Sequence, residues 1–136
     1  MPPEITEIRL WLTKAKRELR ASGMALQTAD PMTDVAGYHA QQAIEKLLKA
    51  HIVHGGGELE KVHDLRLLAI SCTALDSSFS PWIERLAPLS AFAARYRYPG
   101  PADPTIEEAP GALAIAEELW QFVTARLPAE AIPPSA

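Results

Sequence analysis

Apolar residues recur along most of the chain at intervals of three and four, the spacing of one face of an α-helix. The first run predicts a helix over residues 4–26, with inward positions at Ile5, Ile8, Leu12, Ala15, Leu19, Ser22 and Leu26. Asp30-Pro31 predicts the start of a second helix, because a capping side chain precedes proline in the first turn. This helix should reach about His54 and end at the glycines 55–57. One of its faces is narrow and rich in alanine, which favours close approach of a neighbouring helix: Ala36, Ala40, Ala43, Leu47 and Ala50.

Three further helical segments follow, each with its own boundary signal. Asp64 is a candidate N-cap for a helix from Leu65 to about Leu75, with inward positions at Leu65, Leu68, Ala69, Cys72 and Leu75. Ser80-Pro81 begins a fourth segment, which Pro88 should kink or split, with inward positions at Ile83, Leu86, Leu89, Phe92, Ala93 and Tyr96. The proline-rich residues 98–104 exclude a helix. Thr105 and Glu108 then match a capping box for a last helix, which ends near Leu127.

These elements predict an all-α fold, an antiparallel up-down bundle of four to five helices, without strands. The 136 residues suit a single domain over 1–136, with a core at about 4–127 and a disordered tail at 128–136. No apolar run approaches the roughly 20 residues that cross a bilayer. The N-terminus lacks the pattern of a secretory signal, and the single cysteine, Cys72, fits a reducing compartment, so we expect a cytoplasmic protein without membrane partners.

The charge distribution bears on nucleic-acid binding. The net charge is −4, with a balance of +2 over residues 1–26 and −5 over residues 100–136. This argues against broad, nonspecific DNA binding, which needs many contacts from lysine and arginine to phosphates, but it allows a local anion site. The basic residues of the first helix are candidates for contact with RNA or an acidic partner, although a solvated face is the commoner explanation of such a run: Lys14, Lys16, Arg17 and Arg20.

A polar strip on the second helix is the main candidate binding site. His39, Gln42 and Lys46 fall on one flank, with Tyr38 and Lys49 beyond them, and Glu45 forms a favourable i,i+4 pair with Lys49. Lysine supplies a point charge for phosphate and histidine a hydrogen-bond donor. The alternative is a hydrogen-bonded strip that fixes helix register or a dimer seam.

Arginines at the end of the fourth segment form a second candidate group. Arg95, Arg97 and Tyr98 precede the proline-rich turn. An arginine fork suits phosphate or carboxylate. The alternative is that these cations stabilise the helix C-terminus through the helix dipole, without a ligand.

Other chemistry has little support in the sequence. His51 and His54 lie three apart on a helix and His63 lies across a glycine-rich loop, so we expect no metal site. Cys72 lies on an apolar helix face, where a thiol is usually inert. The three tryptophans, Trp11, Trp82 and Trp120, are expected to be core or interface anchors, and Trp11, which lies off the apolar stripe, is a candidate contact to another subunit. No cofactor is predicted.

Residues 38–50 resemble the signature helix of the HEPN family (higher eukaryotes and prokaryotes nucleotide-binding), through the run Gln-Gln-x-x-Glu-Lys-x-x-Lys at 41–49. His63-Asp64-Leu65 and Arg97-Tyr98-Pro99 resemble further steps of that family, in the family's order, so that the likeness covers about residues 4–127. The resemblance implies a helical bundle that is commonly dimeric and is often paired with a small nucleotidyltransferase in a toxin–antitoxin system.

The ribonuclease motif of many HEPN proteins is missing from this chain. The motif is an arginine followed by four to six residues and a histidine, and none of the eight arginines here has a histidine at that spacing. We therefore lean against an enzyme and expect a homodimeric module that binds a nucleotide or a nucleotidyltransferase partner, with His39, Gln42, Lys46 and Arg97 as site residues. Two alternatives are an RNA-cleaving toxin with a divergent site, built from His39 or His63 and Arg97, and a structural helper subunit of another enzyme.

Overall fold

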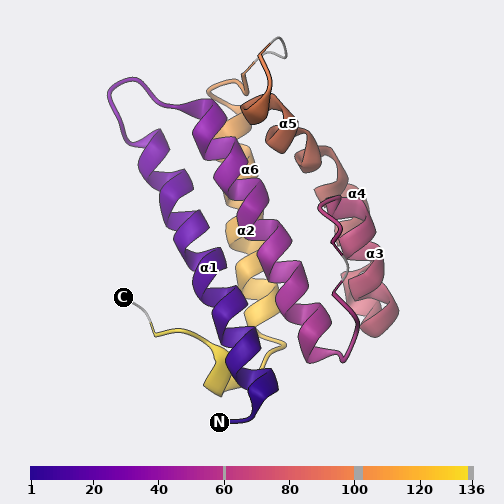
Figure 1. Cartoon of the computed structure of the whole chain (residues 1–136). Helices are drawn as coiled ribbons and strands as arrows, with labels where there is room; N and C mark the ends of the chain where they lie inside the picture. The colour runs from indigo at the N-terminus through magenta and orange to yellow at the C-terminus, as the bar shows by residue number, and fades with distance from the viewer. Residues whose placement is uncertain (60, 100–102, 135–136) are drawn as a thin grey trace.

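A computed structural model of the chain describes residues 1–59, 61–99 and 103–134. Its elements are α1 (Pro3–Leu26), α2 (Thr33–His54), α3 (Leu65–Leu75), η1 (Ser77–Phe79), α4 (Trp82–Leu86), η2 (Ala87–Ser90), α5 (Ala91–Arg97), α6 (Glu108–Thr124) and η3 (Ala129–Ala131), where η marks a 3₁₀ turn. Figure 1 shows α1 and α2 as an antiparallel pair, with α6 behind them and α3 to α5 along the other side of α2. The described residues contain no strand, and the predicted all-α bundle is confirmed.

Helix α2 lies at the centre, because α1, α3, α5 and α6 all contact it. The alanines of its predicted inner face are fully buried: Ala36, Ala40, Ala43 and Ala50. Where α5 crosses α2, even a methyl group has no room, since a Cβ on Gly37 would lie 2.8 Å from Phe92 Cδ1. The buried Ser22 hydroxyl of α1 donates to the Ala36 carbonyl at 2.7 Å, so this polar group is satisfied inside the bundle. The alanine-rich face is thus used within one chain and cannot be a dimer interface.

Helix boundaries follow most of the capping signals. The Asp64 carboxylate accepts from the backbone of Arg66 and Leu67 at 2.9 and 3.2 Å, which confirms this N-cap. The capping box is also confirmed: Thr105 and Glu108 exchange hydrogen bonds of 3.0 Å between side chain and backbone. At the end of α2, Gly56 has φ of +76°, a left-handed conformation that glycine adopts without strain, and the Gly57 N–H reaches the Ile52 carbonyl.

Two helix predictions need correction. Helix α2 begins at Thr33 after Met32, without a side-chain cap, so Asp30 is not the N-cap. Asp30 and Pro31 belong to the connection that reverses the chain between α1 and α2. Leu75 and Tyr96, predicted to point inward, have exposed fractions of 40% and 43%. They lie at the ends of short helices, where Tyr38 stacks on the Tyr96 ring and Gly55 lies against Leu75, and these neighbours leave each side chain partly exposed. The predicted break at Pro88 is confirmed, because η2 separates α4 from α5.

The segment after Leu127 differs from the frayed tail that the sequence predicts. The turn η3 packs against α1, and its Ala131 is fully buried. Lys16 Nζ donates to the Pro134 carbonyl at 2.7 Å, which ties the segment to the middle of α1. The apolar residues 127, 131 and 132 cover the end of the core near the N-terminus, where Figure 1 shows η3 beside the start of α1. In the described part of the chain, no helix combines the length and the apolar character that crossing a bilayer requires.

Candidate functional site

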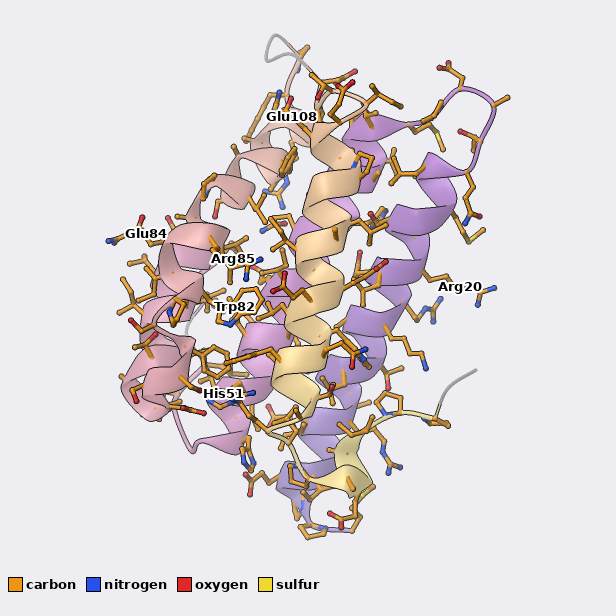
Figure 2. The ribbon with its side chains drawn as sticks, turned by 180° about the vertical axis from the view of Figure 1, so that it is seen from behind. Arg20, His51, Trp82, Glu84, Arg85 and Glu108 are labelled. Carbon is orange, nitrogen blue, oxygen red and sulfur yellow. The ribbon has the colours of Figure 1, made fainter. Side chains whose placement is uncertain are left out.

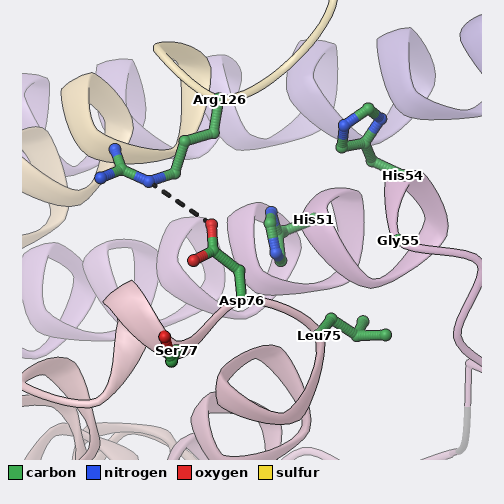
Figure 3. Close-up of a pocket in the computed structure, with 7 residues that line it drawn as sticks. All are labelled: His51, His54, Gly55, Leu75, Asp76, Ser77 and Arg126. Atoms are coloured by element: carbon green, nitrogen blue, oxygen red, sulfur yellow. Dashed lines mark ion pairs between the residues drawn. The ribbon is translucent and has the colours of Figure 1, made fainter.

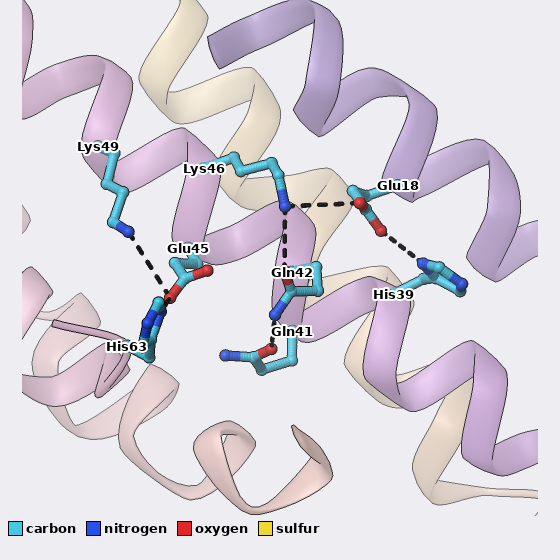
Figure 4. A network of polar contacts seen from close by, with 8 residues as sticks. All are labelled: Glu18, His39, Gln41, Gln42, Glu45, Lys46, Lys49 and His63. Atoms are coloured by element: carbon cyan, nitrogen blue, oxygen red, sulfur yellow. Dashed lines mark hydrogen bonds and ion pairs between the residues drawn. The ribbon is translucent and has the colours of Figure 1, made fainter. Parts of the chain in front are cut away.

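The predicted polar strip on α2 faces an acidic residue of α1, which sequence spacing did not reveal. His39 Nδ1 donates to Glu18 Oε2 at 2.5 Å, and Lys46 Nζ lies 3.5 Å from the other oxygen of the same carboxylate. Lys46 also donates to Gln42 Oε1 at 3.0 Å, and Gln42 Nε2 donates to Gln41 Oε1 at 2.8 Å. Figure 4 shows this chain of contacts bridging α1 and α2.

The strip therefore forms a connected network within one chain. Glu18 balances the charge of Lys46, and each of the three predicted ligand residues has a protein partner. A ligand phosphate at this place would have to replace the Glu18 carboxylate. The geometry matches the alternative interpretation, a strip that fixes the register of two packed helices.

A second polar cluster lies beside the strip, on the same side of α2, around a buried carboxylate. Glu45 has an exposed fraction of only 4%. Its Oε1 accepts from His63 Nδ1 at 2.6 Å and lies 3.9 Å from Lys49 Nζ, the predicted i,i+4 pair. The contact of His63 with Glu45, which no sequence signal indicated, ties the α2–α3 loop to α2 (Figure 4). A buried carboxylate is tolerated because His63 donates a hydrogen bond to it and the Lys49 ammonium group lies nearby as a counter-charge.

A pocket of about 360 Å³ opens beside this second cluster, which we call the Trp11 pocket. It is lined by Trp11, Lys49, Leu59, Lys61 and His63. The ammonium group of Lys49 lies 5.5 Å from the centre of the Trp11 ring, a cation–π distance. Trp11 is partly buried against the core and leaves part of its ring toward the pocket. An aromatic wall and two lysines thus meet at one flank of α2.

The arginines at the end of α5 divide into two roles. Arg95 donates to Glu108 at 3.2 Å and to the Asp103 carbonyl at 3.4 Å, which links α5 to the start of α6. Hydrogen bonds from Arg95 and Thr105 also lower the pKa of the Glu108 carboxyl. Arg97 and Tyr98 are exposed, and within the described residues Arg97 makes no hydrogen bond or ion pair with His39, Gln42 or Lys46. The structure therefore does not join Arg97 to the strip.

A separate pocket of about 570 Å³ lies between the end of α2 and the end of α6 (Figure 3). Its polar lining includes His51, His54, Asp76, Ser77 and Arg126. Arg126 Nε lies 3.7 Å from the Asp76 carboxylate. Burial lowers the pKa of His51, so its imidazole is neutral at pH 7. No sequence signal joined these residues, because they come from three segments that only packing brings together.

The remaining candidates show no catalytic arrangement. Cys72 is fully buried, and desolvation, followed by the nearby charge of Asp76, raises the pKa of its thiol to about 12. A thiol in this state is a poor nucleophile. Across residues 1–59, 61–99 and 103–134, no three histidine, cysteine or acidic side chains are placed to hold a metal ion.

Comparison with known proteins settles the family. A family model described as the HEPN domain matches residues 8–127, most of the chain. The chain belongs to the HEPN-domain family. No curated protein and no solved structure matches it. Within this HEPN domain, the signature helix is α2, which carries both polar clusters, and the arginine–histidine ribonuclease spacing is missing from the sequence.

Proposed function

We propose that this HEPN domain is a nucleotide-binding module without ribonuclease activity, and that the Trp11 pocket holds the nucleotide. In the toxin–antitoxin type of pair that the family resemblance implies, its partner is a small nucleotidyltransferase. The observation that carries the proposal is the meeting of an aromatic ring, two lysines and a histidine in one pocket beside the signature helix.

The chemistry of the Trp11 pocket suits a nucleoside phosphate. Bases stack on aromatic rings, an interaction of about 1–3 kcal/mol per base. Lys61 is exposed and has no ion pair within the described residues, so its charge is open to a phosphate. The cavity volume of about 360 Å³ lies within the usual range for small-ligand sites.

The Trp11 pocket supports binding better than the polar strip does. Lys46 of the strip is paired with Glu18, and Lys49 is likewise paired with Glu45, but the Trp11 pocket also offers Lys61, which has no ion pair within the described residues. Of the seven residues predicted for a nucleotide site on α2 and at the end of α5, Lys49 lines this pocket, and His63, named for the alternative toxin site, lines it too. His39, Gln42, Lys46 and Arg97 remain predictions as ligand residues, and a site there would need the Glu18 network to open.

Calorimetric titration with ATP and with GTP tests the proposal. We expect measurable heat for the wild-type protein and at least about tenfold weaker binding for Trp11→Leu and for Lys61→Ala, or about 1.4 kcal/mol. Lys14→Ala is the matched control, because it removes an exposed lysine of α1 outside the pocket. No heat with millimolar nucleotide, or equal losses in Lys61→Ala and Lys14→Ala, would rule the pocket out.

A protein-interaction role is a second candidate, favoured by the outer face of α3. Leu67, Ile70 and Ala74 repeat at helical spacing and are exposed, so α3 presents an apolar stripe that no described element covers. We propose that a second copy of the chain packs on this stripe.

Sedimentation velocity tests the dimer. The wild-type protein should sediment as two chains of 14.8 kDa each, and Leu67→Glu/Ile70→Glu as one. A wild-type monomer at micromolar concentration contradicts the dimer. Co-purification with the product of an adjacent nucleotidyltransferase gene tests the partner independently.

A further inference from the structure

The outward face of α1 carries three cations that the proposed nucleotide pocket does not use. Thr13, Lys16, Arg17 and Arg20 fall within about 100° of one another at 100° per residue and therefore share one side of the helix. Together with Pro133 and Pro134 they line a hollow of about 380 Å³, which we call the cationic groove. Trp11 lies on the opposite side of α1, at about 160° from Thr13 at 100° per residue, so the groove and the Trp11 pocket are separate sites.

Within the part of the chain that the structure describes, no acidic side chain neutralises the charge of the cationic groove. Arg17 and Arg20 make no ion pair or hydrogen bond within the described residues, and Figure 2 shows Arg20 pointing away from the bundle. Lys16 donates to the Pro134 carbonyl, a neutral partner that leaves its charge in place. The nearest acid in sequence, Glu18, is turned to α2 and bound to His39 and Lys46. Among residues 1–59, 61–99 and 103–134, no carboxylate lines the groove.

One side of the cationic groove is α1, and the other is the segment with Pro133 and Pro134, which is held in place by packing on the core. Ala131 is fully buried and Ile132 packs on the core, so the chain that leads to Pro133 is anchored beside α1. The bond from Lys16 to Pro134 fixes the far end of this wall. The cations therefore stand along a hollow with two sides, which an ordinary solvated helix face lacks.

We infer that the cationic groove binds the phosphodiester backbone of single-stranded nucleic acid. Grooves that hold single strands combine cations along the backbone with flat groups on which bases stack, and arginine planes serve as such groups. Lys16 and Arg20 are four residues apart, about 6 Å along the helix axis, so the cations can meet successive phosphates rather than one. The balance of −5 over residues 100–136 disfavours the larger footprint that a duplex needs.

Fluorescence anisotropy with labelled ten-nucleotide oligouridine and oligothymidine tests the cationic groove. At 50 mM salt we expect Arg17→Ala/Arg20→Ala to weaken binding at least about tenfold, and to reduce the slope of log K against log salt by about 1.4, since each lost phosphate contact accounts for about 0.7. The two oligonucleotides distinguish RNA from DNA as the source of the backbone.

Arg66→Ala/Arg85→Ala is the matched control, because it removes the same charge from exposed arginines that are paired with Glu84 and Glu118. It should change the affinity less than twofold, with both double variants folded by circular dichroism. Equal weakening in the two double variants, or no binding by the wild type at 50 mM salt, overturns the inference. So does binding to phosphatidylserine vesicles but not to oligonucleotides.

The outcome is separate from that of the nucleotide proposal. Lys61→Ala alters the Trp11 pocket and leaves the cationic groove intact, and Arg17→Ala/Arg20→Ala does the reverse. If ATP gives no heat while oligonucleotide binding still depends on Arg17 and Arg20, the nucleotide proposal fails and the groove stands.

Discussion

His51 shows how one buried side chain makes stability depend on pH. The exposed fraction of His51 is 4%, and its ring centroid lies 4.2 Å from that of Phe79. Neither ring nitrogen has a hydrogen-bond partner within the described residues. Desolvation lowers the pKa of His51; the charge of Asp76 opposes this shift, and His54 and Arg126 reinforce it. The unfolded chain therefore takes up a proton near the ordinary pKa of about 6.5, while the folded chain does so only at lower pH.

The sign of the linkage follows from that difference. As pH falls below about 6.5 the unfolded state binds more protons, so the free energy of unfolding decreases toward the lowered pKa of the folded state. We expect the wild type to lose more stability between pH 7.5 and pH 5.5 than His51→Phe, which keeps an aromatic ring without a titrating nitrogen. Urea unfolding at both pH values measures this, and equal losses in the two proteins would contradict it.

At the scale of elements, helix boundaries with a local cause were predictable and those with a distant cause were not. Asp64 and the pair of Thr105 and Glu108 cap their helices through bonds to residues two or three positions away. Pro88 breaks its segment because it lacks a backbone N–H. Asp30 failed as a cap, because the start of α2 is set by how the connection returns to pack on α1. Leu75 fits a helical stripe, but the glycines at the end of α2 cover it only in part.

The crossing of α2 and α5 gives a prediction at the same scale. Alanine at position 37 gains up to about 1 kcal/mol of helix propensity but forces a Cβ into Phe92, and overpacking costs about 1–3 kcal/mol. We expect Gly37→Ala to lower the free energy of unfolding by about 1 kcal/mol. Gly23→Ala in α1 is the control, because its Cβ would meet only Leu113 at 3.9 Å, and it should stabilise slightly. A stabilised Gly37→Ala variant would show that α5 does not press on α2 this closely.

At the scale of the whole molecule, the segment after α6 completes the bundle. It runs back along α1, buries Ala131 against the core and provides one wall of the cationic groove. The sequence from Pro128 onward lacks helical periodicity, and this pattern predicted a frayed tail. In the structure, the turn η3 instead packs against α1. A short apolar segment gains its stability from the surface it covers, which local pattern does not record.

Two substitutions in η3 distinguish a docked segment from a loose one. Ala131→Asp places an unpaired carboxylate at a fully buried position and should lower the free energy of unfolding by about 2 kcal/mol or more. Ala129→Asp adds the same charge at an exposed position of the same turn and should change it by less than about 0.5 kcal/mol. Denaturant unfolding of both variants checks this, and equal effects would mean that the segment is not packed on α1.

The sequence by itself determined the helices, the alanine face of α2 and the HEPN membership, because helical periodicity and signature spacing are written within single segments. It also placed Lys49 beside Glu45, a contact of one helical turn. Only the tertiary structure decided which polar residues are available to a ligand. Glu18 pairs with Lys46 of the strip, and Trp11 lines a pocket beside Lys49. The cations of α1 lie beside a segment more than 110 positions away, which forms the other side of the cationic groove. Each of these contacts joins side chains from segments that are distant in the sequence. Such contacts produce no periodic pattern of residues, so the sequence alone does not reveal them.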